Sequence, residues 1–283
     1  MSEACQNLYR IQLTPTVGSW SNLTTADCPS LSQHACLSMN ERYLVFIGGW
    51  TGRTRTPGVH TYDTVSQKWL PAALNEPLLK GFPSGAGLSA HSAIKMHANQ
   101  VGLGTFASLI IGREGSLRTQ RKAGNIYLLY GDIRERGPGD PKAYYTYREA
   151  NSQLTTSSRS YHTSTPESEN ALITVGGRKD HLIEVLSWKS SSKNSRSPEW
   201  PGTLVYPPDT CTLVTDLVKQ VRQKHLKVSE AVIKNQCLGK MKQARAFAVL
   251  ALNPSDRSAW LQGGVGPGGR VQNTLLRLAQ AND

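Results

Sequence analysis

Long apolar runs and paired cysteines are what this 283-residue sequence lacks. No stretch approaches the roughly 18 to 20 apolar residues that a membrane span needs, and no basic segment followed by an apolar run opens the chain. The five cysteines are scattered and include no CxxC pair, which argues against a disulfide framework and a zinc knuckle. We therefore expect a soluble protein with reduced thiols in the cytoplasm, with the nucleus as a further location.

Catalytic motifs are missing as well. The sequence contains no Gly-rich phosphate loop, no GxSxG and no paired carboxylates at helical spacing. The repeated histidines described below occupy one structural position, which indicates a hydrogen-bonding role within the fold. We predict a non-enzymatic protein with no cofactor and no metal site.

The composition favours many short strands over a few long helices. Only 38% of the residues are hydrophobic, and 25 glycines and 15 prolines punctuate the chain. The formal charge of +12 would suit an acidic partner, either an acidic protein surface or nucleic acid. Charge alone does not distinguish these two.

An internal repeat organises the first two thirds of the chain. Three apolar runs end in glycine, and their first glycines are Gly48, Gly112 and Gly176, so the spacing is 112 − 48 = 64 and 176 − 112 = 64. A histidine lies 14 residues before two of them, at His34 and His162, and 21 residues before Gly112, at His91. Two equal intervals with matching histidines indicate repeated structural units.

Each unit is predicted to contain four short strands separated by turn residues. Glycine pairs let the backbone pass where a β-carbon would clash, and Tyr and Trp supply large faces that fill the gap between units. The positions that we assign to the repeat are His34, Gly48, Gly49, Tyr62, Trp69, His91, Gly112, Tyr127, His162, Gly176 and Gly177.

A glycine pair followed by a Tyr and then a Trp resembles the kelch repeat, over roughly residues 9 to 190. The resemblance implies an all-β fold, a β-propeller with blades of four strands, and binding through loops at the rims. It implies no particular reaction, because a fold does not fix a function.

The pattern is incomplete at both ends. Tyr9 and Trp20 resemble the outer half of a unit whose glycine half is absent, and three to four blades are recognisable where propellers usually need about four to eight. We predict kelch blades over 1–190, a Ser/Pro-rich linker or long loop over 191–211, a basic amphipathic helical segment with one blade strand over 212–250, and a flexible tail over 251–283. Gly263-Gly264 is assigned to that tail, and 273–279 to one or two helical turns.

A basic rim is the leading candidate site. Loops at equivalent points of successive blades gather on one face, and the segments after each glycine pair are basic. Arginine forks suit carboxylates, so we predict that this rim binds an acidic peptide or protein surface. The candidate residues are Arg53, Arg55, Arg113, Arg118, Arg121, Lys122, Arg178 and Lys179.

Two other functions remain open. Ile233, Cys237 and Met241 fall at four-residue spacing on one helical face, which loosely resembles the elongin-binding box of cullin-dependent ubiquitin-ligase receptors. Nucleic-acid binding by the basic segment is the other alternative, but the chain between Thr212 and Ala246 offers no aromatic side chains on which bases could stack.

Overall fold

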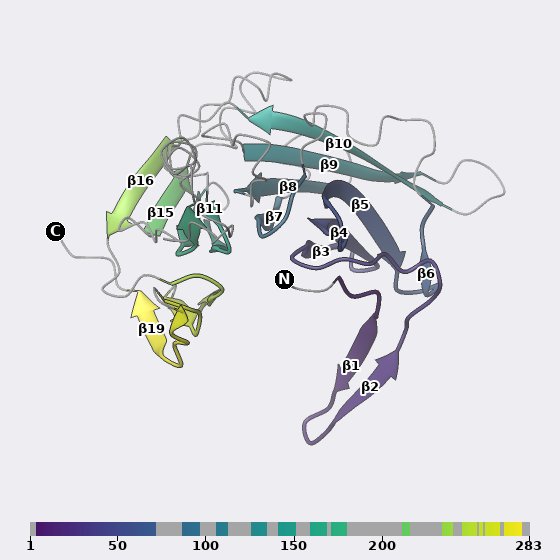
Figure 1. Ribbon diagram of the computed structural model, residues 1–283, viewed down its shortest axis with the longest axis horizontal. Helices are drawn as coiled ribbons and strands as arrows, with labels where there is room; N and C mark the ends of the chain where they lie inside the picture. The colour runs from purple at the N-terminus through teal and green to yellow at the C-terminus, as the bar shows by residue number, and fades with distance from the viewer. Residues whose placement is uncertain are drawn as a thin grey trace, which may run out of the picture. The chain divides into compact units, whose positions relative to one another are not determined.

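A computed structural model describes the chain as a series of small β-sheets (Figure 1). The described residues are 4–71, 87–96, 106–112, 126–134, 141–150, 159–168, 171–179, 211–215, 234–239, 245–253, 255–256, 258–266 and 269–278. Every regular element in these ranges is a strand, which confirms the predicted all-β class. The described residues contain no helix that is long and apolar enough to cross a membrane.

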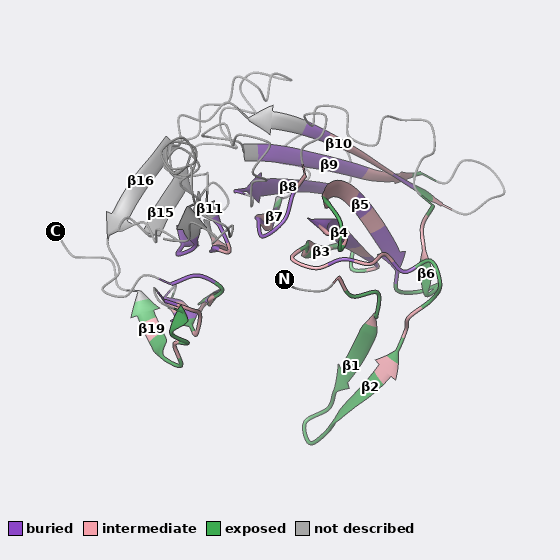
Figure 2. Ribbon diagram, in the orientation of Figure 1, coloured by how far each residue is buried: buried purple, intermediate pink, exposed green. Residues whose placement is uncertain are grey.

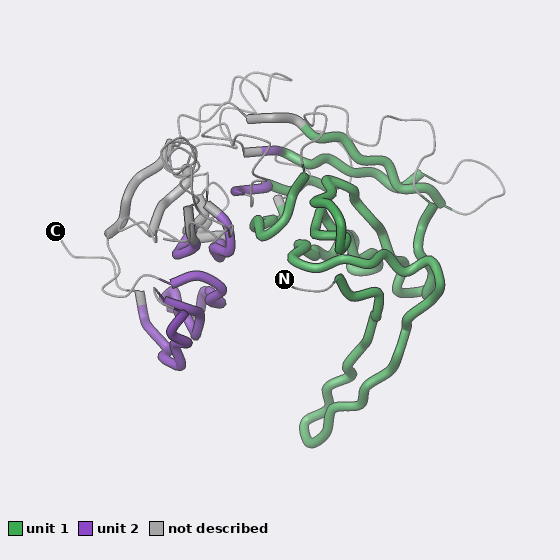
Figure 3. Tube along the Cα trace, in the orientation of Figure 1, with its two compact units in different colours: residues 1–109, 128–148 green, residues 110–127, 149–283 purple. Residues whose placement is uncertain are grey.

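The chain divides into two compact units (Figure 3). Unit 1 comprises residues 1–109 and 128–148 and holds a hairpin, one four-stranded sheet and most of a second. Its strands are β1 (Tyr9–Leu13), β2 (Gly18–Asn22), β3 (Ala35–Met39), β4 (Tyr43–Trp50), β5 (Arg55–Asp63), β6 (Lys68–Trp69), β7 (Ser92–Met96), β8 (Phe106–Ile111), β9 (Ile126–Arg134) and β10 (Lys142–Ala150). Strands follow one another in sequence order across both four-stranded sheets, as expected for kelch blades.

Unit 2 comprises residues 110–127 and 149–283 and repeats this plan. A four-stranded sheet has the order β12-β13-β15-β16, a three-stranded sheet has the order β17-β18-β19, and β11 pairs with β14. The strands are β11 (Arg159–Ser160), β12 (Thr163–Ser168), β13 (Ala171–Val175), β14 (Arg178–Lys179), β15 (Cys211–Thr215), β16 (Lys234–Gly239), β17 (Val249–Leu252), β18 (Ala259–Gln262) and β19 (Leu275–Leu278).

The second strand of each blade carries much of the core (Figure 2). In β4, Tyr43, Val45 and Ile47 are buried on one face of the pleat, and all six residues of β8 are buried. In unit 2, Val175 of β13 packs in one cluster with Leu250 and Leu261 of the following sheet. Successive blades therefore bury apolar surface against each other within a unit.

The hairpin β1–β2 is exposed over its whole length except Ser21. Ile11 pairs with Trp20 across the hairpin, so both lie on the same face, and they are 41% and 69% exposed. This is the antiparallel pair expected of the segments that carry Tyr9 and Trp20.

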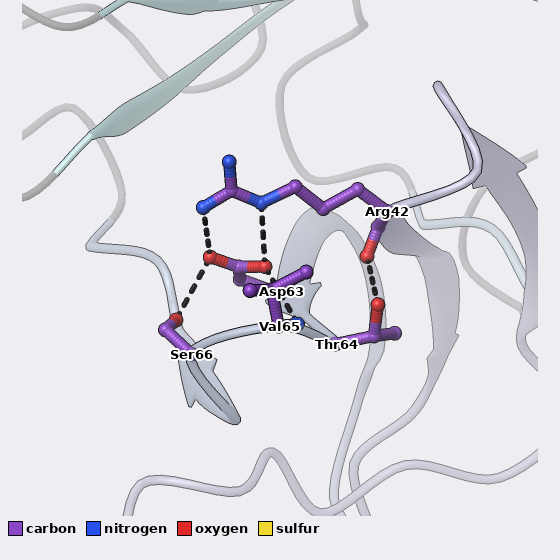
Figure 4. A network of polar contacts seen from close by, with 5 residues as sticks. All are labelled: Arg42, Asp63, Thr64, Val65 and Ser66. Carbon is purple, nitrogen blue, oxygen red and sulfur yellow. Dashed lines mark hydrogen bonds and ion pairs between the residues drawn. The ribbon is translucent and has the colours of Figure 1, made fainter.

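A bidentate ion pair fixes the turns at one end of the β3–β6 blade (Figure 4). Arg42 Nε and Nη2 donate to the two oxygens of Asp63 at 2.8 and 2.7 Å, and Ser66 Oγ and the Val65 amide donate to the same carboxylate. The Asp63 side chain is 1% exposed. The Arg42 guanidinium holds the pKa of Asp63 well below its usual range.

Replacing this carboxylate should destabilise unit 1. Asp63→Asn leaves the Arg42 fork and two further donors without a charged acceptor, at an expected cost of about 2–4 kcal/mol in urea unfolding at pH 7. Because the folded-state pKa is depressed, the contribution is complete above about pH 4 and is lost as the pH falls further. The matched control is Asp132→Asn, since its pair with Arg134 is exposed and should cost no more than about 0.5 kcal/mol. Equal effects of the two substitutions would contradict this role of Asp63.

The prediction of a helical carboxyl-terminal segment is wrong where the structure describes it. Residues 211–215 and 234–239 of that region form β15 and β16, whereas β17 at 249–252 overlaps the one blade strand that was predicted there. The first two complete the sheet begun by β12 and β13. Residues 216–233 lie outside the described residues, as do 180–210 with most of the predicted linker. Because those segments are not described, the predicted domain boundaries stay predictions.

Gly263-Gly264 is a third glycine pair, after Gly48-Gly49 and Gly176-Gly177, and it marks a fourth repeat, so its assignment to a flexible tail is wrong. It follows β18, and the predicted helical turns at 273–279 are replaced by β19. Gly263 has a φ of +68°, against +65° at Gly48, +67° at Gly112 and +71° at Gly176. A β-carbon on Gly264 would lie 2.7 Å from the Ala246 carbonyl oxygen, as one on Gly177 would lie 2.8 Å from that of Ser160.

A pair of alanine substitutions tests this fourth repeat. Gly264→Ala combines a left-handed φ of +97° with a backbone clash, so it should destabilise unit 2 by about 2–4 kcal/mol. Gly269→Ala has a φ of +76° but no atom within 4 Å of the added β-carbon, so it should cost only about 1 kcal/mol. The measurement is urea unfolding of both variants. A Gly264→Ala variant as stable as Gly269→Ala would contradict the role of Gly264 in a fourth repeat.

Candidate partner-binding surface at the glycine end of the blades

The start of the first strand and the glycine pair meet at one end of each blade, which we call the glycine end. In the β3–β6 blade, Ser32 pairs with Trp50, directly after Gly48 and Gly49. Ser160 pairs with Arg178 in the same way, and Ala246 pairs with Val265. The Arg42–Asp63 pair lies at the opposite end of its blade, because it joins the β3–β4 turn to the end of β5.

Backbone hydrogen bonds join neighbouring blades at this end. The amide of Gly49 donates to the Leu88 carbonyl at 2.7 Å, and that of Ala90 donates to the Gln33 carbonyl at 2.9 Å. In unit 2 the amide of Gly177 donates to the Arg245 carbonyl, and that of Phe247 donates to the Tyr161 carbonyl, both at 2.9 Å. The same two bonds therefore connect successive blades in each unit.

A left-handed residue recurs at this junction. Gln33, Ala90, Tyr161 and Phe247 have φ values of +57°, +53°, +55° and +59°, and we call them the left-handed row. An L-residue pays about 1–2 kcal/mol for this conformation, which is uncommon for bulky side chains. The repeat therefore imposes the backbone at these positions, whatever the side chain.

The predicted repeat histidines follow this row directly. His34, His91 and His162 come after Gln33, Ala90 and Tyr161, and Ala248 takes the place after Phe247. The β-carbons of His34, His162 and Ala248 all lie against the second glycine of their own blade. The histidines were predicted from the sequence and the row was not, although a Ser-X-His motif repeats in blades one to three with the row residue at its centre.

One basic turn at the glycine end is held together by its own hydrogen bonds. The turn between β4 and β5 holds Thr51 and Thr54 together: the Thr51 amide donates to the Thr54 carbonyl at 2.9 Å, and the Thr51 hydroxyl bonds to both the amide and the carbonyl of Thr54. Arg53 is exposed on this turn. A partner would therefore meet Arg53 on a fixed backbone.

Arg55 is tied to its own molecule. Its Nε donates to Ser89 Oγ at 3.1 Å, and its guanidinium lies 5.6 Å from the centre of the Trp50 ring. Arg55 thus links the first blade to the second, and Arg53 is the better candidate for contact with a partner.

The remaining basic candidates are only partly described. Arg178 and Lys179 form β14, paired with Ser160 and Arg159 of β11. Arg113, Arg118, Arg121 and Lys122 lie outside the described residues. The structure therefore describes basic residues after Gly49 and Gly177.

The aromatic repeat positions lie within the blades. Tyr62 and Trp69 pair across β5 and β6, with ring centres 5.2 Å apart at 61°. Tyr62 and Tyr127 are each 1% exposed. Tyr147 of β10, also buried, donates its hydroxyl to the Pro57 carbonyl of the neighbouring blade at 2.8 Å.

The chain is similar to Kelch domain-containing protein 9 of Mus musculus, with 31% identity over 194 residues, which are 66% of this chain and 50% of the relative. The protein of the same name from Homo sapiens is 30% identical over 190 residues, 65% of this chain and 49% of the relative. The chain is a relative of the kelch family. It spans about half the length of these curated relatives. No family model matches the chain.

Two solved structures resemble this chain at lower sequence identity. A fungal alcohol oxidase of the AA5 family, in complex with copper, is 14% identical with a TM-score of 0.49, covering 93% of this chain and 46% of the oxidase. YjhT is 10% identical with a TM-score of 0.42, covering 96% of this chain and 88% of its own. Both scores are below 0.5, so neither structure supports a conclusion about activity or ring size.

The described residues of this kelch relative do not form a metal-binding group of three or more His, Cys, Asp or Glu. The predicted elongin-binding helix is wrong at its centre, because Cys237 lies in strand β16. Because Cys237 has an extended backbone, it cannot lie on one helical face with Ile233 and Met241.

Burial of His91 makes the stability of unit 1 depend on pH. Burial and, to a lesser extent, the charge of His34 lower the pKa of His91 to about 4, against the opposing effect of the Ile47 backbone. In the unfolded chain His91 takes up a proton as the pH falls below about 6.5, whereas in the folded chain it stays neutral until about pH 4. Unit 1 therefore keeps its full free energy of unfolding above pH 6.5 and loses part of it as the pH falls toward 4. We expect a loss of about 2 kcal/mol between pH 7.5 and 5 from this group, measured by urea unfolding. His91→Gln should flatten the pH dependence, and an unchanged slope would contradict the assignment.

Proposed function

We propose that this chain is a non-enzymatic protein-interaction module whose partner binds at the glycine end of its blades. Kelch-repeat relatives support an interaction scaffold as the general function. The observation that carries the finer proposal is the exposed Arg53 on the hydrogen-bonded Thr51–Thr54 turn. This turn directly follows Trp50, which pairs with Ser32, the residue before Gln33 of the left-handed row. A rigid turn lowers the entropy lost on binding, which favours a recognition role.

An acidic peptide or acidic protein surface is the proposed partner. The chain carries a net charge of +12, and basic residues follow Gly49, Gly112 and Gly177 in the sequence. Guanidinium groups bind carboxylates in a bidentate manner, as Arg42 binds Asp63 within this chain. We propose the cytoplasm, and also the nucleus, as the place where this binding occurs.

The alternatives receive less support. The cullin-receptor hypothesis depended on a helical box, and that helix is replaced by a strand at Cys237. Nucleic-acid binding depended on a basic helix over the same region; residues 211–215 and 234–239 of it are strands, and its basic residues between 216 and 233 lie outside the described residues.

Charge reversal of the basic rim tests the proposal. The variant changes Arg53, Arg118, Arg121 and Arg178 to Glu, and we expect capture of acidic partner proteins from cell extract to fall at least tenfold with little change in unfolding midpoint. Loss of about four charge-assisted contacts would easily account for that factor. The matched control changes Arg10, Lys68, Arg134 and Arg270 to Glu, because this reversal has the same charge and none of these residues belongs to the predicted rim. Equal loss with both variants would show a general charge effect and contradict a specific rim.

A further inference from the structure

Two aromatic side chains stack at the glycine end of unit 2. The rings of Tyr161 and Phe247 have centres 4.1 Å apart and an interplanar angle of 37°. They come from successive blades, linked by the hydrogen bond from the Phe247 amide to the Tyr161 carbonyl. Phe247 remains 51% exposed in this contact.

The fold does not require aromatic residues here. The equivalent positions of unit 1 are Gln33 and Ala90, which adopt the same left-handed backbone and make the same inter-blade hydrogen bond. A glycine would adopt this backbone without strain. An exposed phenylalanine at such a position is therefore better explained by a surface role than by the needs of the repeat.

Basic residues occur on strands that are next to this aromatic pair along the chain. Arg159, Arg178 and Lys179 lie on the two-stranded sheet β11–β14, whose first strand ends at the residue before Tyr161. Arg245, two residues before Phe247, is fully buried and donates to the Gly263 carbonyl and to Thr274 Oγ1. With the net charge of +12 on the chain, the basic residues of β11 and β14 favour an acidic segment of a partner over a cationic one.

We propose that Tyr161 and Phe247 form a stacking site for an aromatic side chain of the partner, whose acidic neighbours are recognised by the basic residues of the adjoining β11–β14 pair in the same unit. This inference rests on the proposed function and specifies its ligand: an acidic peptide that carries a Trp, Tyr or Phe. The partner ring packs against the exposed part of Phe247, edge-on or offset, as aromatic pairs prefer. The side chains at these two positions of the left-handed row then determine which residue of the partner binds there.

A peptide selection tests this site. The full chain selects binders from a displayed library in which alternate residues are Asp or Glu and the others are randomised. We expect wild type to enrich aromatic residues, and the selected peptides to bind about 3- to 10-fold more tightly than the same peptides with the aromatic residue changed to Ala. Phe247→Gly should abolish this preference while it keeps the left-handed backbone, so its unfolding midpoint should not fall. Val249→Ala is the matched control, because Val249 is 65% exposed in β17 and lies outside the ring pair.

The outcomes separate this inference from the proposed function. Selection of acidic peptides without aromatic residues, or an aromatic preference that survives Phe247→Gly, would overturn the stacking site and leave the acidic partner standing. Failure to enrich acidic peptides over a neutral library would contradict the proposed function itself. Tighter binding of single-stranded oligo(dT) than of any peptide, lost in Phe247→Gly, would assign the rings to nucleobases and also overturn the inference.

Discussion

The hydrogen bond from the second glycine of one blade to a carbonyl of the next is the contact on which this fold depends. Gly49 makes it to Leu88, and Gly177 makes it to Arg245. The backbones approach so closely that a β-carbon on Gly48 would lie 2.8 Å from the Leu88 side chain, and one on Gly176 would contact the Arg245 carbonyl. In unit 1 this close approach places Gln33, Ala90 and the β4–β5 turn at the same end of the blades.

Much of this arrangement is visible in the sequence because the contact leaves a strict trace. Glycine fits this approach without a clash, so Gly48, Gly112 and Gly176 recur at a spacing of 64 residues and reveal the first three blades. The histidines recur because their β-carbons pack on those glycines. The all-β class and the blade pattern follow from these two markers, and the similarity to kelch relatives agrees with them.

The fourth repeat and the aromatic pair escaped prediction for physical reasons. Ala246-Phe247-Ala248 stands where Ser-X-His occurs earlier, and only the small β-carbon of Ala248 is needed against Gly264. Apolar residues three and four apart between 212 and 250 favoured a helix, but pairing with β13 makes Cys211–Thr215 a strand instead. Tyr161 and Phe247 are 86 residues apart (247 − 161), and only the inter-blade hydrogen bond brings their rings together.

The left-handed row also has a consequence for design. Its backbone is fixed by hydrogen bonds of main-chain atoms, and the chain already tolerates Gln, Ala, Tyr and Phe there. Randomising Gln33 and Ala90 in unit 1, or Tyr161 and Phe247 in unit 2, would therefore produce a library of molecules that share one scaffold and differ at one junction between blades. Selection from that library could redirect this fold toward chosen peptides without redesign of its core.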